Sequence, residues 1–365
     1  MKIRALLTAR IAPKVLNNLL FQAEQTSPTA SHQRQLNFIQ KSWSRSLSSF
    51  NEKQEISSSS KYSLTTVISG FPKTQRNSRF NRNLDGQVGE DAYFISRYES
   101  EQNLDNKTSS EKDISLSINS ADVVGIADGV GGWKLYGIDP SRFSRQLMKN
   151  CEQLVKSGQF DSTKPTGLLS NAYYDMKKAK EQNIFGSSTA CLTMVGHNCG
   201  IMYTANMGDS GLLVVREGVL VHITEEQTHC FNTPYQLSLP PPEHMQPGTL
   251  IDSPNDADVY KFQVQNGDII LLGTDGLFDN VDINIILKII NRLNSQKIDI
   301  GILQKCCDAI AITAQELSRN ETFMSPFAKN AMYHGYKDMF GGKEDDITVL
   351  LSFVNKADIQ NSNEE

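Results

Sequence analysis

Short apolar segments of this chain end at carboxylates, which limits how the chain can fold. The mostly apolar residues 121–127 lead directly into Asp128, which Gly129, Gly131 and Gly132 follow. A carboxylate at the end of a buried strand is costly unless a cation neutralises it, and glycines leave the peptide oxygens open to a ligand. An Asp-Gly pair is equally typical of an ordinary turn, so this segment alone leaves both interpretations open.

The arrangement recurs at three other places in the chain. The further acids are Asp275 and Asp279 after residues 269–273, Asp345 and Asp346 before residues 347–353, and Glu90 and Asp91 before residues 92–95. Four strand ends with carboxylates predict one shared site lined by oxygen atoms, because the acids would repel one another without bound divalent cations. Oxygen ligands favour Mg²⁺ or Mn²⁺ over Zn²⁺.

Hydrophobic patterning predicts the secondary structure. Expected strands lie at residues 92–98, 122–127, 188–195, 200–206, 212–215, 259–264, 269–273 and 347–354. Asp139 is expected to cap a helix that begins at Pro140, and further helices are expected at residues 166–181, 282–293 and 299–317. Short connections favour antiparallel pairing, so the sequence predicts an α+β fold with two packed antiparallel β-sheets flanked by helices.

Six segments of the chain resemble the metal-dependent serine/threonine protein phosphatases of type 2C, the PPM family. They occur in the family's order at residues 90–92, 128–132, 186–190, 206–210, 274–279 and 345–349, and the match covers about residues 84–354. The branch of mitochondrial matrix phosphatases linked to coenzyme Q synthesis is similar at residues 128–143, 231–242 and 324–328. The resemblance implies the same fold, a PPM-type β-sandwich.

The family's metal-site residues can be carried over to the matching positions of this chain. The resemblance implies that Asp128 bridges two ions and that the carbonyl of Gly129 binds one of them. It also implies that Asp91 and Glu90 hold metal-bound waters. Asp275 and Asp345 would complete the shell of the second ion, and Asp209 and Asp279 would bind a third, weaker ion. For Asp209, a turn acid without metal is an equally open interpretation.

The chemistry expected of such a centre is hydrolysis by a metal-activated water. Two cations about 3.5–4 Å apart can share a water, lower its pKa and stabilise charge on the phosphoryl oxygens. The resemblance implies that Asp128, Asp91 and Asp275 are the catalytic residues. The resemblance implies a Mn²⁺- or Mg²⁺-dependent phosphatase that acts on phosphoserine and phosphothreonine of mitochondrial proteins without a covalent enzyme intermediate.

The chain departs from the family pattern at three places. Val130 stands where most members have the His that is often proposed to protonate the leaving alkoxide, so another acid would have to supply that proton. Asp346 replaces the usual Asn, and residues 86–89 replace a stretch that commonly holds a phosphate-binding Arg. The candidate substitutes, each of which could equally be a solvated surface residue, are Arg79, Arg82 and Arg142.

The first 24 residues are typical of a mitochondrial presequence. Residues 1–20 carry Lys2, Arg4, Arg10 and Lys14 but no acid, and their apolar residues recur at largely helical spacing. This pattern predicts import into the mitochondrion, with the matrix as the expected compartment, rather than secretion, which needs an uninterrupted apolar core. An ordinary basic surface helix is the alternative.

Composition predicts one enzyme-sized domain after this segment. Residues 25–69 are expected to be a Ser-rich disordered or processed segment, residues 70–356 the phosphatase domain, and residues 357–365 a polar tail. The net charge is −5, but the first fifty residues hold seven bases and one acid, so removing that +6 leaves −11 for the rest. An acidic body disfavours nucleic acid as a partner, and no apolar run approaches the ~18 residues of a membrane span.

The cysteines predict free thiols rather than disulfides or a zinc site. They show no paired spacing and are Cys151, Cys191, Cys199, Cys230, Cys306 and Cys307. Cys151 and Cys191 lie in apolar segments and are expected in the core. No cysteine lies in a phosphate-binding loop beside an Arg, which argues against the nucleophilic cysteine of a tyrosine phosphatase.

Two polar segments predict surface loops. Residues 99–120 are expected to form an exposed loop without catalytic residues. Residues 225–258 contain several prolines that would restrict a surface flap, and we hypothesise that this flap helps to select the phosphoprotein. His229 in the flap is more typical of a surface or packing residue than of a catalytic acid.

Two other functions remain open. Val130 and the missing upstream Arg favour an adaptor that keeps a catalytically weak phosphatase fold and acts through protein binding. A metal-dependent hydrolase of a small phosphate ester is the second alternative. The intact set of acids argues against the adaptor, because only metal binding would justify so many adjacent carboxylates.

Overall fold

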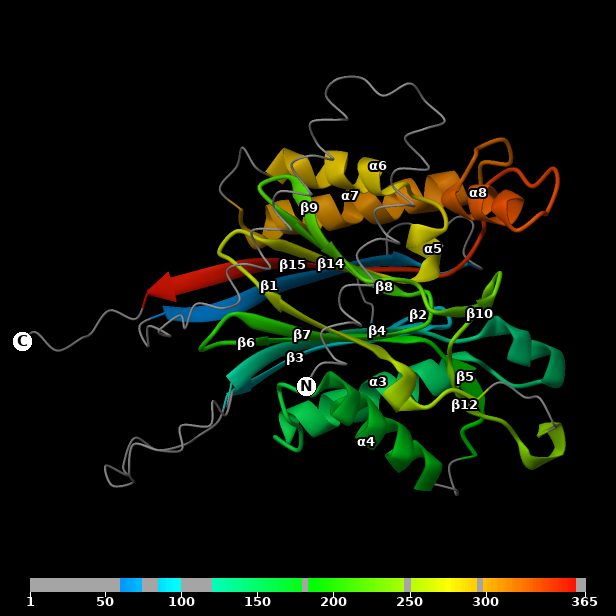
Figure 1. The fold of residues 1–365 in the computed structure, drawn as a ribbon, viewed down its shortest axis with the longest axis horizontal. Helices are drawn as coiled ribbons and strands as arrows, with labels where there is room; N and C mark the ends of the chain where they lie inside the picture. The colour runs from blue at the N-terminus through cyan, green and yellow to red at the C-terminus, as the bar shows by residue number, and fades with distance from the viewer. Residues whose placement is uncertain are drawn as a thin grey trace, which may run out of the picture. The chain divides into compact units, whose positions relative to one another are not determined.

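The described part of the chain forms two antiparallel sheets packed face to face, with helices on their outer faces (Figure 1). The computed structural model describes residues 60–73, 85–99, 120–178, 183–245, 251–293 and 298–358, which all belong to the unit that begins at Ser58. The predicted presequence, most of the predicted disordered segment, the core of the predicted loop at 99–120, and Arg79 and Arg82 lie outside the described residues.

The first sheet has five strands in the order β1, β15, β14, β8, β9. Their bounds are β1 Ser60–Phe71, β15 Ile347–Asp358, β14 Ile269–Gly273, β8 Gly211–Arg216 and β9 Val219–Ile223. β1 pairs with β15 along its whole length. The predicted domain start at residue 70 is therefore wrong, and β15 also runs past the predicted end at residue 356. β1 is rich in Ser and Thr, so its composition resembles the polar segment before it, although Leu64 and Val67 are buried.

The second sheet has six strands in the order β13, β7, β6, β4, β3, β2. Their bounds are β13 Asp258–Gln263, β7 Ile201–Met207, β6 Ala190–Gly196, β4 Ser120–Asp128, β3 Asp91–Glu99 and β2 Gln87–Val88. Two short pairs lie beside this sandwich: β5 Gly186–Ser188 with β12 Leu237–Leu239, and β10 Thr228–Cys230 with β11 Thr233–Pro234.

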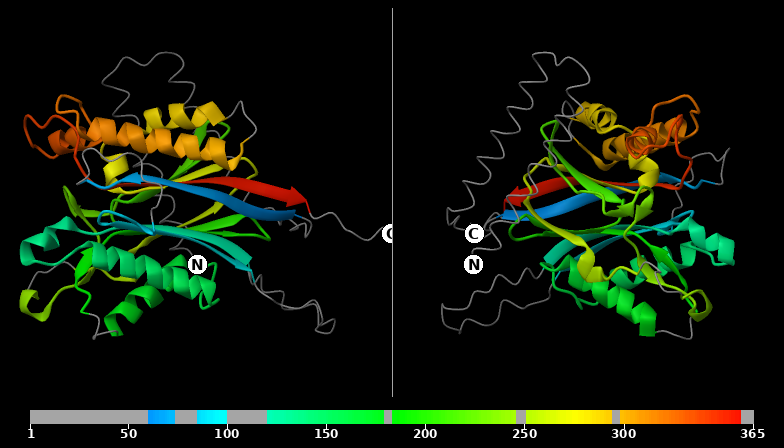
Figure 2. Two further views of the ribbon diagram at one scale, coloured as in Figure 1. Left: turned by 180° about the vertical axis from the view of Figure 1, so that it is seen from behind. Right: turned by 45° about the vertical axis from the view of Figure 1, so that its right-hand side comes forward.

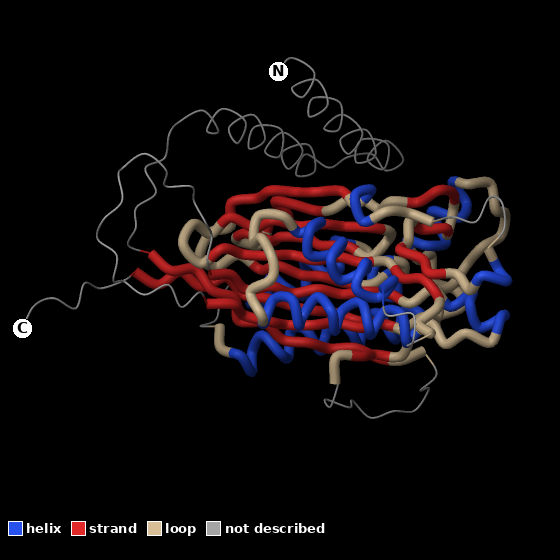
Figure 3. Tube along the Cα trace, turned by 90° about the horizontal axis from the view of Figure 1, so that it is seen from below, coloured by secondary structure: helices blue, strands red, loops and turns tan. Residues whose placement is uncertain are grey.

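Helices cover the outer face of each sheet, as Figure 2 shows from two further sides. α3 Ser141–Lys156 and α4 Pro165–Lys178 pack on the second sheet, and α6 Ile283–Ile290 and α7 Ile300–Ser318 lie on the side of the first sheet. Viewed from below in Figure 3, α3 and α4 cross in front of the strands. α5 Asp275–Phe278 and α8 Pro326–Tyr333 lie at one end of the first sheet.

Apolar side chains fill three layers between these elements. One cluster lies between α3, α4 and the second sheet, and another lies between α6, α7 and the first sheet. The third lies between the two sheets and includes Ile126, Cys191, Leu272 and Leu350. This packing explains why Val, Ile and Leu occupy alternate or continuous positions along the central strands, which are buried on both faces.

The predicted fold class is confirmed, with local differences. The single strand predicted at 188–195 is divided into β5 and β6, and α3 begins at Ser141, one residue after the predicted start, while Asp139 Oδ1 accepts a 3.0 Å hydrogen bond from the Ser141 N–H. Several elements were not predicted: β1, β2, β9, β10, β11, β12, α5 and α8. None of the helices in the described ranges combines the length and the apolar character that a bilayer span requires.

Candidate active site

Neighbouring strands of the second sheet bring two carboxylates together. Asp91 is the first residue of β3, Asp128 is the last residue of β4, and the two are register partners in the antiparallel pair. Because the strands run in opposite directions, the start of one and the end of the other meet at the same edge of the sheet. Asp91 and Asp128 can therefore belong to one site although they are far apart in the sequence.

The first sheet brings its own acids to the same place. Asp275 begins α5 directly after β14, and Asp345 precedes β15, the antiparallel neighbour of β14. Two hydroxyls from this sheet reach across to the other one: Thr274 Oγ1 donates to Asp91 Oδ2 at 2.8 Å, and Thr348 Oγ1 donates to the same oxygen at 2.7 Å. The predicted meeting of acids from both sheets is thus present.

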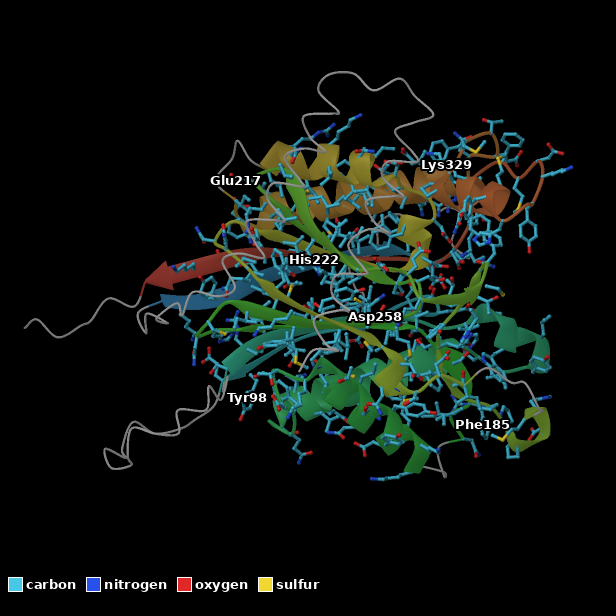
Figure 4. All side chains as sticks on the ribbon, in the orientation of Figure 1. Tyr98, Phe185, Glu217, His222, Asp258 and Lys329 are labelled. Carbon is cyan, nitrogen blue, oxygen red and sulfur yellow. The ribbon has the colours of Figure 1, made fainter. Side chains whose placement is uncertain are left out.

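This site lies at one end of the sandwich. In Figure 4, the labelled Phe185 and Lys329 lie at the end that carries α5 and α8, whereas Tyr98 and Glu217 lie at the opposite end. Tyr98 is near the far end of β3, which starts at Asp91. The acids are therefore gathered where strands end and loops begin.

The backbone around Asp128 is held by the segments at 186–190 and 206–210. The Asp128 N–H donates to Thr189 Oγ1 at 3.1 Å, and the Thr189 N–H donates to the Asp128 carbonyl at 3.0 Å. Thr189 Oγ1 also shares a 2.8 Å hydrogen bond with Ser210 Oγ, next to Asp209. These contacts explain why small hydroxyl residues stand in those two segments.

Gly129 is required by close packing. A Cβ at this position would lie 2.7 Å from the Pro140 carbonyl oxygen and 2.8 Å from that of Glu90, and the Gly129 N–H donates to the Glu90 carbonyl at 3.2 Å. The glycine therefore lets the chain turn beside Asp128 while the start of α3 approaches. Its own carbonyl is the predicted metal ligand.

Asp346 holds the turn that carries Glu90. Its Oδ1 accepts a 2.6 Å hydrogen bond from the Lys73 N–H, and its Oδ2 accepts one of 2.7 Å from the Glu90 N–H. An Asn could accept at only one of these two positions. Gly89, with φ +62°, leaves room for this carboxylate, because a Cβ there would overlap it. The departure from the family pattern at Asp346 therefore has a structural role.

A lysine lies among the remaining acids. Lys343 Nζ is 2.5 Å from Asp275 Oδ2, 2.7 Å from Asp279 Oδ2 and 3.7 Å from Asp345 Oδ2. Burial opposes ionisation of Asp275, but the Lys343 charge holds its pKa below the ordinary value. Burial disfavours the Lys343 ammonium as well, but Asp275 and Asp279 outweigh that effect and raise its pKa.

The other acids have raised pKa values because they are withdrawn from water and lie near like charges. Asp91 is fully buried, and burial followed by the charge of Asp346 raises its pKa well above the ordinary range. Burial and then Asp275 do the same for Asp128, and for Asp209, which lies between β7 and β8. Burial and acidic neighbours raise the pKa of Asp279 to about 7 and that of Asp345 to about 6. Without a bound cation, full ionisation of the cluster is therefore unfavourable, and its acids retain protons to higher pH than free carboxyl groups do.

Buried oxygens without partners show where a cation would fit. Asp91 Oδ1, Asp209 Oδ1 and Asp275 Oδ1 have no hydrogen-bond partner among the described residues. Each such acceptor costs about 1–3 kcal/mol or more, and a hard divalent cation would satisfy it. Over the described ranges no three acid, His or Cys side chains converge on one point as metal ligands. The carboxylate oxygens of these acids are the donor type that Mg²⁺ and Mn²⁺ prefer, and three of them lack a partner, so the residues fit either ion.

The remaining predicted residues have varied surroundings. Arg142 is exposed in the first turn of α3. Val130 contributes only its backbone, whose N–H donates to the Ser187 carbonyl at 3.0 Å. His229 Nε2 lies 3.1 Å from both oxygens of Asp252 and its ring stacks on Tyr235, which supports the predicted packing role.

The cysteine predictions agree with the structure. All six cysteines are free thiols, and Cys151 and Cys191 are fully buried in the apolar clusters. Burial raises the pKa of both thiols, which makes them poor nucleophiles. The structure thus gives no support to a catalytic cysteine at these two positions.

Several polar residues that surround the acids were not predicted from the sequence. These are Lys343, the two hydroxyl donors Thr274 and Thr348, and Lys134, whose ammonium pairs with Glu90. A basic residue two positions before Asp345, within an acidic stretch, was the one available signal for Lys343. The threonines resemble ordinary strand residues until the two sheets are packed together.

Comparisons with known proteins identify the class. No protein-family model matches the chain. The chain is 44% identical over 293 residues to the protein phosphatase PTC7 homolog of Xenopus laevis, a match that covers 80% of this chain and 90% of the relative. It is 43% identical over 293 residues to the human PTC7 homolog, with 80% and 88% covered, and 39% identical over 297 residues to the PTC7 homolog fig of Drosophila erecta, with 80% and 84% covered.

A solved structure supports the same conclusion. The photosystem II phosphatase PBCP superposes with a TM-score of 0.60 at 28% sequence identity, over 80% of this chain and 98% of that chain. Fold and acid-lined site together define a serine/threonine protein phosphatase of the type 2C class. Within that class, the chain belongs to the PTC7 family of protein phosphatases.

Proposed function

We propose that this chain is a Mn²⁺- or Mg²⁺-dependent protein phosphatase that hydrolyses phosphoserine and phosphothreonine in mitochondrial proteins without a covalent enzyme intermediate. The observation that carries the proposal is the pair of buried, unpartnered oxygens on Asp91 and Asp275, at the ends of strands from different sheets. Unpaired acceptors of this kind are unfavourable in a finished fold, and bound cations would remove the penalty.

The chain's residues divide the work of such a site. Asp128, the Gly129 carbonyl, Asp275 and Asp345 would hold two ions, with Asp91 and Glu90 arranged around them. When bound, the ions would supply an activated water and neutralise charge on the phosphoryl oxygens. Thr274 and Thr348 orient the carboxylate of Asp91 by hydrogen bonds to its Oδ2.

Cations at the rim suit an anionic substrate. The Lys134 side chain is 57% exposed and pairs with Glu90, while Lys73 Nζ lies 3.4 Å from Asp345 Oδ1. Either ammonium is available to a phosphate that enters between these acids, which would compensate for the missing upstream Arg. Val130 has no proton to give, so the leaving alkoxide must receive its proton from another source.

A catalytic assay tests the proposal. The purified chain should release phosphate from phosphoserine and phosphothreonine peptides with added Mn²⁺ and should release little in a chelator. Small phosphate esters should be poorer substrates. Absence of Mn²⁺-dependent release from every peptide would favour the adaptor, and preference for a small ester would favour the alternative hydrolase.

Localisation and substrate choice extend the proposal. The basic, acid-poor segment at residues 1–20 supports import into the mitochondrial matrix. Deleting it should leave phosphatase activity intact and keep the protein in the cytosol, and undiminished import would contradict the presequence interpretation. The flap at residues 225–258 would help to select the phosphoprotein, an idea that fails if a short linker in its place leaves activity on peptide and protein substrates unchanged.

A further inference from the structure

Lys343 is fixed among the acids by contacts at both ends. Its ammonium is within 2.7 Å of one oxygen of Asp275 and one of Asp279, and its side chain is only 19% exposed. Its backbone N–H donates to Asn280 Oδ1 at 2.8 Å, and Asn280 Nδ2 donates to the Lys343 carbonyl at 2.9 Å. Asn280 is fully buried, so the lysine is held in place before any ligand arrives.

A second element encloses the ammonium. Lys343 Nζ lies 5.2 Å from the ring centroid of Phe327 on α8, and the Phe327 N–H donates to the Asp279 carbonyl at 3.0 Å. An aromatic face stabilises a cation and excludes water from it. Ion pairs to Asp275 and Asp279 are correspondingly stronger than pairs on the surface would be.

The carboxylate of Asp275 can serve the lysine and a metal ion together. Its Oδ2 accepts the Lys343 hydrogen bond, whereas its Oδ1 is buried and has no partner among the residues that the structure describes. Asp91 Oδ1 is open in the same way. Two ions could therefore bind while Lys343 stays where it is. Asp279 is not available to a metal ion in this way. A third ion would bind between Asp209 and Asp279, but Lys343 already neutralises the Asp279 carboxylate.

We infer that the Lys343 ammonium takes the place of a third metal ion in this site, so that the chain binds two divalent cations and uses its own lysine as the remaining cation. The inference rests on the metal dependence proposed above. A further divalent ion next to Asp279 would meet the positive charge of Lys343 within a few ångströms, and like charges at that separation disfavour binding.

Counting bound Mn²⁺ tests this role directly. Native mass spectrometry and titration calorimetry should find two Mn²⁺ per wild-type chain. In Lys343→Met, which keeps the stem but loses the charge, a third Mn²⁺ should bind, and the melting temperature in chelator should fall by several degrees because Asp275 and Asp279 lose their counter-ion. Lys343→Arg should keep two ions and most of the stability.

Matched variants separate the outcomes. Lys329→Met on α8 removes a surface lysine whose side chain is 54% exposed and should match the wild type in both measurements. Three ions in the wild type, or two ions and unchanged stability in Lys343→Met, would overturn the inference. If Lys343→Met does not fold, the number of Mn²⁺ ions bound by Asp279→Asn decides. This variant should still bind two Mn²⁺, because Asp279 is proposed to bind Lys343 and no metal ion. Loss of one ion would overturn the role of Lys343. A wild type that binds no Mn²⁺ would instead refute the metal dependence itself.

Discussion

Asp91 and Asp128 face each other as register partners at the edge where β3 begins and β4 ends. Both have pKa values raised by burial and by neighbouring acids, and Asp91 is tied to the opposite sheet through Thr274 and Thr348. The pair therefore lies at the centre of the proposed metal site and connects the second sheet to the first.

Asp128→Asn should lower turnover on a phosphopeptide by at least about 10³-fold, because the carboxylate proposed to bridge both ions is lost. Adding Asp275→Asn should cost little more, since residues that act as one unit give non-additive effects. Asp161→Asn removes an exposed turn acid and serves as the control, with activity like that of the wild type. Independent, multiplying losses in the double variant would contradict a shared centre.

Asp128→Asn and Asp275→Asn should have opposite effects on the stability of the metal-free protein. Asp128 is destabilised by its neighbours, so removing its charge should raise the melting temperature in chelator. Asp275 is stabilised by Lys343, so its removal leaves a buried ammonium with one fewer partner and should lower the melting temperature. Differential scanning calorimetry in chelator checks both signs. A fall for both variants would mean that repulsion does not dominate at Asp128.

The metal-free protein should lose stability as the pH rises from about 4 to about 7. Asp345 and Asp279 have folded-state pKa values of about 6 and about 7, whereas the ordinary value is 3.8. Between these limits the folded chain binds more protons than the unfolded chain, so each increment of pH favours unfolding. Denaturant titrations in chelator at pH 5 and pH 7 measure the difference. The slope should shrink in Asp279→Asn, and a stability that rises across this window would contradict the raised pKa values.

The strand-end acids were predictable from sequence because Asp128, Asp275 and Asp345 each stand next to an apolar run that must be buried. Antiparallel pairing then brings such ends together with little further information. Lys343 was not predictable, because two hydrogen bonds to Asn280 set its position. Asn280 lies just after α5, 63 residues earlier in the sequence. β1 escaped prediction because Ser and Thr make up five of its 12 residues, and its pairing partner β15 lies at the other end of the described chain.

Thr348→Val should weaken Mn²⁺ binding by about 10- to 100-fold, in line with the loss of a residue that orients a metal-site carboxylate. The hydroxyl of Thr348 donates a 2.7 Å hydrogen bond to Asp91 Oδ2 and lowers the pKa of that acid. Without this hydrogen bond the pKa of Asp91 should rise further, so protons should compete with Mn²⁺ for the carboxylate up to a higher pH. Titration calorimetry at two pH values checks this expectation. Thr66→Val, which removes a hydroxyl paired with Ser352 elsewhere in the same sheet, should leave Mn²⁺ affinity unchanged.

Anomalous diffraction at the manganese edge, from crystals of the wild-type chain grown with Mn²⁺, tests the central claim most directly. The account predicts two peaks among Asp91, Asp128, Asp275 and Asp345, with the carboxylate of Asp128 touching both ions and the Lys343 ammonium still on Asp279. Peaks that lie away from these acids, or a fully loaded crystal in which Asp128 contacts no ion, would contradict it.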